Sequence, residues 1–198
     1  NLNNNWDSLS YFLGISLGYQ TVDMFSDIQP ALVASGMNTV LHDSSMYDEQ
    51  QAQMIQMQII NTIMEKKANE DAKEGEAFLK ENGKRDDVFT TESGLQYEPL
   101  IEGEGIRPEA TSTVTVHYHG TLIDGTVFDS SVERGEPATF RLNQVIKGWT
   151  EGLQLMTVGS KYKFYIPAYL GYGDRSPSQA IPPNSVLIFE VELLDVQN

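Results

Sequence analysis

Two pairs of polar residues in the second half of the chain have the side chains that acid–base or metal chemistry requires. Asp129 and Glu133 stand four residues apart, and a pair of carboxyl groups can serve as general acid and general base. His117 and His119 stand two residues apart, so on a strand they would share a face, where imidazoles can bind zinc. No third metal ligand is evident near them. We interpret the carboxylates as part of a local turn or helix cap, formed with the serines between them, and the histidines as a polar strand face.

Several other chemistries lack the residues that they need. The chain contains no cysteine, which excludes a thiol nucleophile, a disulfide and a zinc–thiolate site. Gly103, Gly105, Gly171 and Gly173 do not form a phosphate-binding loop. We therefore expect a protein that works without a metal ion and without any other cofactor.

A group of aromatic and aliphatic residues near predicted loops and strand ends is more informative. Trp149, one of two tryptophans, lies in the glycine-flanked stretch VIKGWTEGLQLM. Such residues, with few polar companions, could line an apolar pocket. From their types alone, Trp149 and Phe189 would also fit ordinary core positions. The group comprises Tyr118, Phe128, Val145, Ile146, Trp149, Tyr172, Ile181 and Phe189.

These residues belong to a half of the chain whose hydrophobic residues alternate with period two. Val114, Val116 and Tyr118 would share one face of a strand. The same alternation recurs over residues 161–166 and 187–193, and Asp124-Gly125 indicates a hairpin turn. The stretch around Trp149 has a helical period instead, with Trp149, Leu153 and Met156 on one face, which predicts one short helix that carries Trp149 in its first turn and has Gly159 as its stop. We expect this helix to pack on a curved antiparallel sheet.

The first half of the chain has few glycines and a helical rhythm, which predicts three helices. The first spans Asp7–Gln20, with Asp7 or Ser8 as its N-cap, and the second spans residues 27–41. The third runs from about Met46 to Asn82, and Ser45 with Asp48 resembles a capping box. Three helices over about 85 residues give a thin core. We therefore expect a second copy of the chain to cover their apolar faces, the alternative being a self-contained bundle with a charged linker.

The composition limits the possible partners. Hydrophobic residues make up 40% of the 198 residues, enough for a packed core, and the formal net charge is −15. So acidic a chain repels phosphate backbones, and we expect no nucleic-acid partner. No apolar run of about 18 residues is present. The chain begins at Asn1 rather than methionine, which we interpret as processing or trimming.

Several long stretches of the chain resemble one enzyme family. The second half closely resembles the FKBP-type peptidyl-prolyl cis/trans isomerases in TVTVHYHGTLIDGTVFDSS, VIKGWTEGLQLMTVGSKYKFYIP, LGYG and IPPNSVLIFEVELLDV. Further upstream, the chain resembles the Mip-like subgroup, named after the macrophage infectivity potentiator, in SYFLGISLGYQ, GEAFLKENGK and ESGLQYEPLIEGEG. The resemblance covers essentially the whole chain, and it is strongest from about Gly94 to Val196.

The resemblance implies an α+β fold in which a curved antiparallel sheet of five or six strands wraps around a short helix. It also implies a helical dimerisation domain over residues 1–45, a long connecting helix over residues 46–85 and an isomerase domain over residues 86–198. In the implied homodimer, the long helices hold two isomerase domains apart as the arms of a V.

The resemblance also implies an activity, namely cis/trans isomerisation of Xaa-Pro bonds in unfolded or partly folded proteins. Chaperone action would accompany it, in the periplasm or at the outer membrane, and macrolides such as rapamycin would inhibit the enzyme. One alternative stays open: the same pocket binds proline-containing segments without significant turnover, and the helical domain supplies the chaperone activity.

Finally, the resemblance implies roles for individual residues. Trp149 would form the floor beneath the proline ring, and Tyr172 would donate its hydroxyl to a substrate carbonyl. Asp129, paired with Arg134, would stand near the carbonyl of the rotating bond, and Phe128 would complete the catalytic group. Ala138 stands where many members of the family carry a large aromatic residue, which would widen the pocket. The remaining substrate-binding residues would be Tyr118, Val145, Ile146 through its backbone N–H, Ile181 and Phe189, with Phe140 close to the site.

Overall fold

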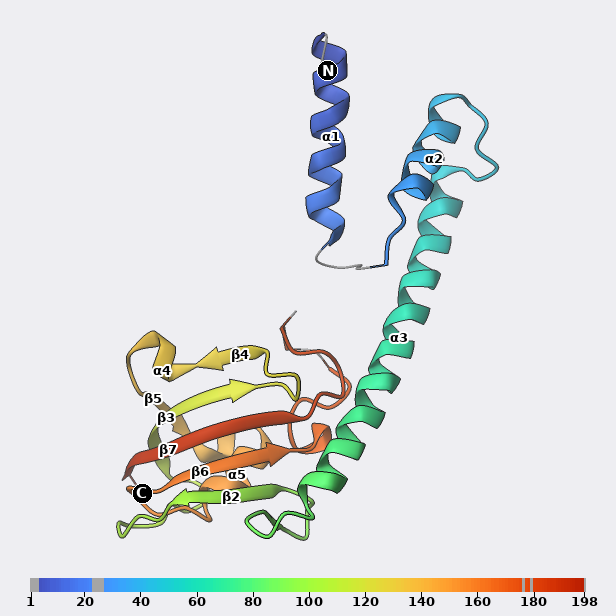
Figure 1. The fold of residues 1–198 in the computed structure, drawn as a ribbon. Coiled ribbons are helices and arrows are strands. Elements are labelled where there is room, and N and C mark those ends of the chain that lie inside the picture. The colour runs from blue at the N-terminus through green and yellow to red at the C-terminus, as the bar shows by residue number, and fades with distance from the viewer. Residues whose placement is uncertain (1–3, 23–26, 176, 179, 198) are drawn as a thin grey trace. The chain divides into compact units, whose positions relative to one another are not determined.

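The computed structural model describes residues 4–22, 27–175, 177–178 and 180–197. The chain forms two compact units, residues 1–59 and 60–198, and the division falls inside the long helix α3 (Glu49–Asn82). Helices α1 and α2 precede α3, and an antiparallel sheet with short helices follows it (Figure 1). The α+β fold class is therefore confirmed. The boundaries suggested by the sequence, after residues 45 and 85, lie near the two ends of α3.

Helix α1 occupies the region that the periodicity predicts, but its cap is a different residue. The helix spans Asn5–Val22, and the Asn4 side chain accepts the backbone N–H of Asp7 at 2.9 Å. The prediction of Asp7 or Ser8 as the N-cap is wrong, because Asn4 supplies the acceptor earlier in the chain.

Helices α2 and α3 also begin later than the sequence suggests. Helix α2 spans Pro30–Leu41 rather than starting at Asp27, since a proline has no N–H and fits the first helical position. In front of α3, Asp48 accepts the Gln51 backbone N–H at 2.8 Å, and the Gln51 side chain accepts the Asp48 N–H at 3.1 Å. This is a capping box three residues further along the chain than the predicted pair of Ser45 and Asp48.

The second unit contains one antiparallel sheet, with seven strands among the described residues. Their order is β1-β2-β6-β7-β3-β4, and β5 pairs with the same strand, β3, that β4 pairs with. The sheet exceeds the expected five or six strands because helix α4 (Ser131–Arg134) divides the partner of β3 into two short strands, and because a two-residue strand adds to one edge. The strands are β1 (Phe89–Thr90), β2 (Gln96–Ile101), β3 (Thr113–Thr121), β4 (Val127–Ser130), β5 (Ala138–Arg141), β6 (Lys161–Ile166) and β7 (Leu187–Gln197).

Alternate residues of the long strands face the core, as the period of two predicts. On β3, Val114, Val116 and Tyr118 are buried, and the residues between them are half-buried. Strands β6 and β7 alternate in the same way over most of their length. Tyr165 breaks the pattern on β6, because its ring packs against Phe78 of α3 with the ring centroids 6.0 Å apart.

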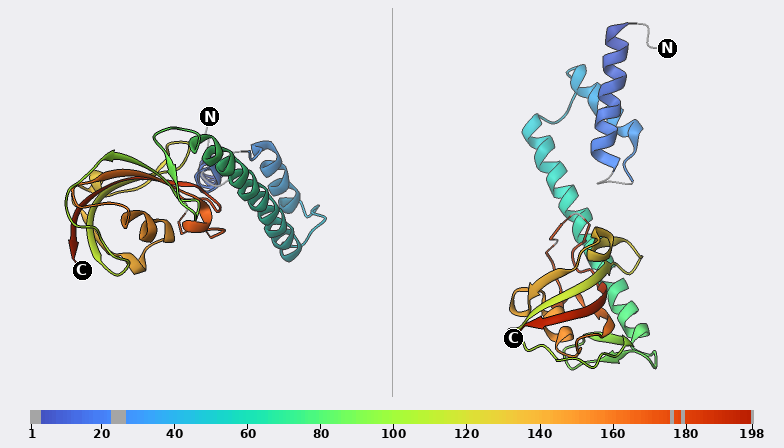
Figure 2. Two further views of the ribbon diagram at one scale, coloured as in Figure 1. Left: turned by 90° about the horizontal axis from the view of Figure 1, so that it is seen from below. Right: turned by 90° about the vertical axis from the view of Figure 1, so that its left-hand side faces the viewer.

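The core lies between the inner face of the sheet and helix α5 (Lys147–Leu153). The left view of Figure 2 shows the sheet arching around this helix. Trp149 stands in the first turn, as predicted. The predicted end near Gly159 is wrong, because the helix ends at Leu153. Met156 lies beyond the helix but is fully buried. Its apolar side chain therefore indicated a core position and not a further helical turn.

Two glycines allow α5 to approach strand β6 closely. A Cβ added at Gly148 would lie 2.5 Å from Cγ2 of Ile166, and one added at Gly152 would lie 2.7 Å from Cε1 of Phe164. Glycine costs about 1 kcal/mol in a helix interior relative to alanine. The close approach explains why these positions accept that cost, since an added methyl group would overlap buried side chains.

We predict that Gly152→Ala lowers the free energy of unfolding by about 1–3 kcal/mol, although alanine is the better helix former. The added methyl group must displace the ring of Phe164, which is fully buried. Urea unfolding followed by circular dichroism measures the effect. Lys147→Ala, at an exposed position of the same helix, is the control and should change the free energy by less than about 0.5 kcal/mol. A Gly152→Ala protein more stable than the wild type would contradict this packing.

Candidate active site

A cavity of about 570 Å³ opens between helix α5, the inner face of the sheet and the segment that joins η2 (Ala168–Leu170) to β7. Every residue that the sequence predicted to act in catalysis or to bind substrate lines this cavity, except Arg134. The lining residues are Tyr118, Phe128, Asp129, Phe140, Gln144, Val145, Ile146, Trp149, Tyr172, Pro177, Ser178, Ile181 and Phe189.

Trp149 is held at the cavity by three other rings. Its side chain is only 4% exposed, and it lies edge-to-face against Tyr118, Phe140 and Phe189 with ring centroids 5.3, 5.4 and 5.2 Å away. Perpendicular aromatic contacts of this kind are favourable and restrict how a ring can turn. The indole N–H is buried without an acceptor among the described residues. The position of the ring therefore depends on the shapes of its neighbours rather than on a hydrogen bond.

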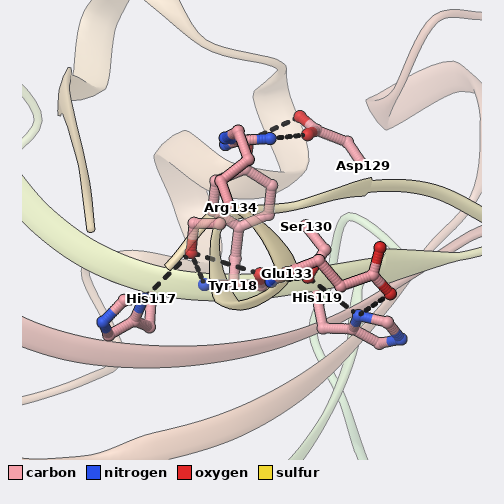
Figure 3. Close-up of polar contacts among 8 residues, drawn as sticks. His117, Tyr118, His119, Asp129, Ser130, Glu133 and Arg134 are labelled. Carbon is pink, nitrogen blue, oxygen red and sulfur yellow. Dashed lines mark hydrogen bonds and ion pairs between the residues drawn. The ribbon is translucent and has the colours of Figure 1, made fainter. Parts of the chain in front are cut away.

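A closed set of polar contacts joins Asp129, Tyr118 and Arg134 (Figure 3). Arg134 forms an ion pair with the Asp129 carboxylate, whose other oxygen accepts the Tyr118 hydroxyl at 2.5 Å. Arg134 also donates to the Tyr118 hydroxyl oxygen at 2.8 Å. Arg134 thus stays outside the cavity and acts on it through Asp129 and Tyr118.

These contacts set the charges in the cavity. Partial burial raises the pKa of Asp129, but the hydrogen bonds from Tyr118 and Arg134 and the charge of Arg134 lower it by more, so the pKa lies below its ordinary 3.8. Burial, followed by the contact with Asp129, raises the pKa of Tyr118. Burial and the Asp129 charge also raise the pKa of Tyr172. At neutral pH these three groups therefore present one carboxylate and two neutral hydroxyls.

Besides the buried indole N–H, the hydrogen-bond donors at the cavity without a partner among the described residues include two that a ligand could reach. One is the hydroxyl of Tyr172, whose side chain is 39% exposed. The other is the backbone N–H of Ile146, the residue that precedes the first turn of α5. Both donors are available to a ligand that carries carbonyl oxygens.

The hydroxyl of Ser131 fills a gap in the backbone hydrogen bonds that hold Tyr118 in place. Strand β3 pairs with β5 up to Val116 and with β4 only from His119 onward. Between them, Ser131 Oγ accepts the Tyr118 N–H at 2.8 Å and lies 3.3 Å from the Tyr118 carbonyl oxygen. Ser131 is fully buried, so these contacts replace strand pairing where water cannot reach.

Of the polar residues that suggested acid–base or metal chemistry, Asp129 lines the cavity, whereas Glu133 and His119 have structural roles. Ser130 caps α4 by accepting the Glu133 N–H at 3.2 Å, which confirms the interpretation as a helix cap. Nδ1 of His119 lies 3.0 Å from Ser130 Oγ and 4.0 Å from Glu133 Oε1. Because both groups approach the same nitrogen, the three do not form a proton relay. Within the described ranges, no group of three or more His, Asp or Glu side chains could hold a metal ion.

One serine in the first unit matches a catalytic sequence motif but lacks the structure that the motif requires. Residues 14–18 read G-I-S-L-G, which matches the pattern around a hydrolase nucleophile. That pattern requires a sharp turn from a strand to a helix, whereas these residues lie inside helix α1.

Three lining residues were absent from the predicted site, namely Gln144, Pro177 and Ser178. Gln144 ends the short 3-10 helix η1 (Leu142–Gln144), directly before the predicted Val145 and Ile146, and Pro177 and Ser178 lie in the segment between η2 and β7. None of the three belongs to a periodic pattern. Ala138, at the position where the resemblance implies a wider pocket, packs against the core from β5 and is not among the lining residues.

Comparison with known proteins identifies the class to which this fold and site belong. Residues 104–194 match the family model of the FKBP-type peptidyl-prolyl cis-trans isomerases, and residues 6–98 match the domain found amino-terminal to such isomerases. FkpA of Aeromonas hydrophila, an FKBP-type peptidyl-prolyl cis-trans isomerase, is 44% identical over 94% of this chain and 75% of its own. The outer membrane protein MIP of Legionella longbeachae is 41% identical over 96% of this chain and 85% of its own.

A solved structure agrees with these sequence comparisons. The crystal structure of FkpA from Escherichia coli matches with a TM-score of 0.79 and 35% identity, over 100% of this chain and 99% of that one. The chain therefore belongs to the FKBP-type peptidyl-prolyl cis-trans isomerases, and it is an isomerase whose substrates contain proline.

We predict that Arg134→Met moves the acid limb of the isomerase activity to higher pH, because losing the cation raises the pKa of Asp129. In the wild type, the lowered pKa keeps Asp129 charged, so kcat/KM should be constant from about pH 5 to pH 8. The same lowered pKa affects stability: ionised Asp129 stabilises the folded state at pH values above the ordinary carboxyl pKa. This contribution is lost as the pH falls through the lower pKa of Asp129 in the folded protein. A proline tetrapeptide assay across pH measures the limb.

Arg141→Met supplies the matched control, since Arg141 is exposed on β5. It should keep the wild-type pH profile. If Arg134→Met and the wild type lose activity at the same pH, Arg134 does not control the ionisation of Asp129.

Proposed function

We propose that the 570 Å³ cavity is where this isomerase rotates the Xaa-Pro bond, with the proline ring on Trp149. The observation that supports this is a cavity lined mostly by apolar and aromatic residues, in which Asp129 is the one charged residue among the described lining. The barrier to rotation about a peptide bond is about 18–20 kcal/mol because the planar amide is conjugated. Rotation breaks this conjugation and reduces the charge separation of the amide. A cavity that removes water therefore penalises the planar form more than the twisted one.

The polar groups at the cavity would position the substrate. The Tyr172 hydroxyl and the Ile146 N–H have no partner among the described residues, and each can bind a carbonyl oxygen of the substrate chain. Asp129, held by Tyr118 and Arg134, would stand beside the carbonyl of the rotating bond. Phe128, Val145, Ile181 and Phe189 would enclose the proline ring from the sides. This mechanism needs no nucleophile, metal ion or cofactor.

We predict that Trp149→Leu and Asp129→Val each slow a proline-limited refolding reaction catalysed by the protein at least about fivefold. The first change removes the flat surface beneath the proline ring, and the second removes the only charge on the described lining. The rate of refolding of a protein with a non-native prolyl isomer measures the effect, and rapamycin should compete with the substrate. Val132→Ala, at an exposed position of α4, should leave the rate unchanged. Wild-type rates for both site variants would exclude the cavity as the site of isomerisation.

The first unit exposes apolar side chains that need a partner. Helix α2 has no buried residue, and on α1 Phe12, Leu13 and Tyr19 are 60, 57 and 76% exposed. Met54 and Ile59 on α3 are also more than half exposed. Exposed apolar surface on this scale marks an interaction site. We infer that a second copy of the chain covers these helices, since residues 6–98 match a domain that precedes FKBP-type isomerases and a symmetric dimer buries the same surface on both copies.

Dimerisation would give the protein a chaperone function. Two isomerase cavities joined in one particle can hold two segments of one unfolded chain, and the second contact forms at a high effective concentration. We further propose that the protein acts in the cell envelope, which is supported by the name of the Legionella longbeachae relative as an outer membrane protein. Among the described residues, no helix combines the length and apolar character needed to cross a bilayer.

We predict that the full chain sediments as a dimer at micromolar concentration, whereas residues 60–198 sediment as a monomer. The shorter chain keeps the compact second unit, so its kcat/KM on a proline tetrapeptide should stay within about twofold of the full chain. It should protect a chemically unfolded protein from aggregation much less, because the paired arrangement is lost. Analytical ultracentrifugation and light scattering measure the two properties. A monomeric full chain would refute the dimer without affecting the proposed isomerase site.

A further inference from the structure

The segment that joins η2 to β7 has two sides with different neighbours. On one side, Tyr172 and Ile181 line the isomerase cavity. On the other side, Asn184 and Val186 line a second cavity of about 620 Å³, whose opposite wall is helix α3. We refer to residues 171–186 of this segment, where described, as the rim. Its position therefore depends on what lies behind it as well as on the cavity that it borders.

The base of the rim is closed by backbone hydrogen bonds. The Asn184 N–H donates to the Gly173 carbonyl at 2.7 Å, and the Gly173 N–H donates to the Ala168 carbonyl at 2.8 Å. Asn184 has φ of 62°, a left-handed conformation that asparagine tolerates better than most residues. Tyr172 stands next to Gly173 in the chain, so a shift of Asn184 would be transmitted to the residue that offers its hydroxyl to the substrate.

Helix α3 contacts the back of the rim at two places. The Asn184 side chain donates to the carbonyl of Ala68 on α3 at 3.4 Å. About two turns further along, Gly75 faces Val186 so closely that an added Cβ would lie 2.8 Å from Val186 Cγ2. Gly75 is buried within a 34-residue helix, where glycine costs about 1 kcal/mol relative to alanine. The close contact with Val186 gives a physical reason for glycine at this position.

The last turns of α3 are themselves fixed to the sheet. Asn82 donates to the Gln96 side chain at 2.9 Å, and Gln96 donates to the Leu79 carbonyl at 2.8 Å, with Asn82 and Gln96 both buried. Arg85, just after the helix, donates to the Tyr165 hydroxyl at 2.9 Å and pairs with Glu98 on β2 at 3.0 Å. This part of α3 therefore offers the rim a firm support.

We propose that α3, over residues 68–79, is a working part of the isomerase site, in which Gly75 and Asn184 are positioning residues for Tyr172 and Ile181. The proposal rests on the proposed role of the cavity. It adds that the position of the rim is set by α3, and not only by the sheet and α5. It follows that the residues which bind the substrate chain depend on contacts behind the rim that never touch the substrate.

The test uses the full chain and compares two positions on α3. Gly75→Leu should push the helix away from Val186, whereas Ala77→Leu adds a side chain at an exposed position of the same helix. Asn184→Gly keeps the left-handed backbone accessible and removes only the side-chain donor. We expect Gly75→Leu and Asn184→Gly each to lower kcat/KM on a proline tetrapeptide about fivefold, mainly through KM, and Ala77→Leu to leave it unchanged.

Two further measurements distinguish positioning from a loss of stability. The NMR amide signals of Tyr172 and Ile181 should shift in Gly75→Leu and Asn184→Gly, while those of β3 stay in place. In a Tyr172→Phe background, Asn184→Gly should have a smaller effect on kcat/KM than it has alone, because both changes act through one group.

The outcomes separate this inference from the function on which it rests. If Tyr172→Phe lowers kcat/KM but Gly75→Leu and Asn184→Gly behave like Ala77→Leu, the support by α3 is refuted and the cavity keeps its role. Unchanged amide signals at Tyr172 and Ile181 would refute it as well. If Tyr172→Phe has wild-type activity, Tyr172 does not bind the substrate, and both its proposed role at the cavity and its positioning by α3 are refuted.

Discussion

The close packing of helix α5 on strand β6 is the contact on which the rest of the site depends. Gly148 and Gly152 bring the helix onto Ile166 and Phe164 with no room for a further methyl group. This approach places Trp149, in the same helix, within reach of rings from three strands. The rings come from the sheet, so they support the indole without filling the cavity that it lines. A looser helix would let the aromatic side chains collapse into that space, since interiors tend toward close packing.

The polar part of the site solves a related problem, because a charged group beside an apolar cavity must be fixed and paired. Asp129 accepts a hydrogen bond from the Tyr118 hydroxyl and forms an ion pair with Arg134, and Arg134 also donates a hydrogen bond to the Tyr118 hydroxyl oxygen. Each of these three residues thus contacts the other two, and of the three only Asp129 and Tyr118 line the cavity. The backbone of Tyr118 is fixed in turn by the buried Ser131 hydroxyl. The division of β4 from β5 is therefore linked to the site, because α4 supplies both Ser131 and Arg134.

Much of this arrangement could be predicted from the sequence, and the parts that could not share a physical cause. The strands follow from alternation, the turn at Gly125 has the expected positive φ of 87°, and the cavity residues follow from the family resemblance. The cap of α1 was mispredicted because Asn4, Asp7 and Ser8 can all accept an N–H, and local sequence does not choose among them. The end of α5 was mispredicted because Met156 is buried whether or not the helix continues. Pro177 and Ser178 line the cavity from a segment without a periodic pattern, and Gln144 was missed although it directly precedes the predicted Val145.

Helix α3 shows how one element can meet two different requirements along its length. Over its first part, residues such as Met54, Met57 and Ile59 are largely exposed and apolar, which suits a surface that associates. Over its last part, Gly75 and Asn82 are buried, and the contacts are specific: one close approach without a side chain and one buried pair of amides. Apolar association tolerates small changes of register, whereas a buried amide pair and a fitted glycine do not. The helix is therefore adaptable where it would meet a partner and fixed where it supports the rim of the isomerase cavity.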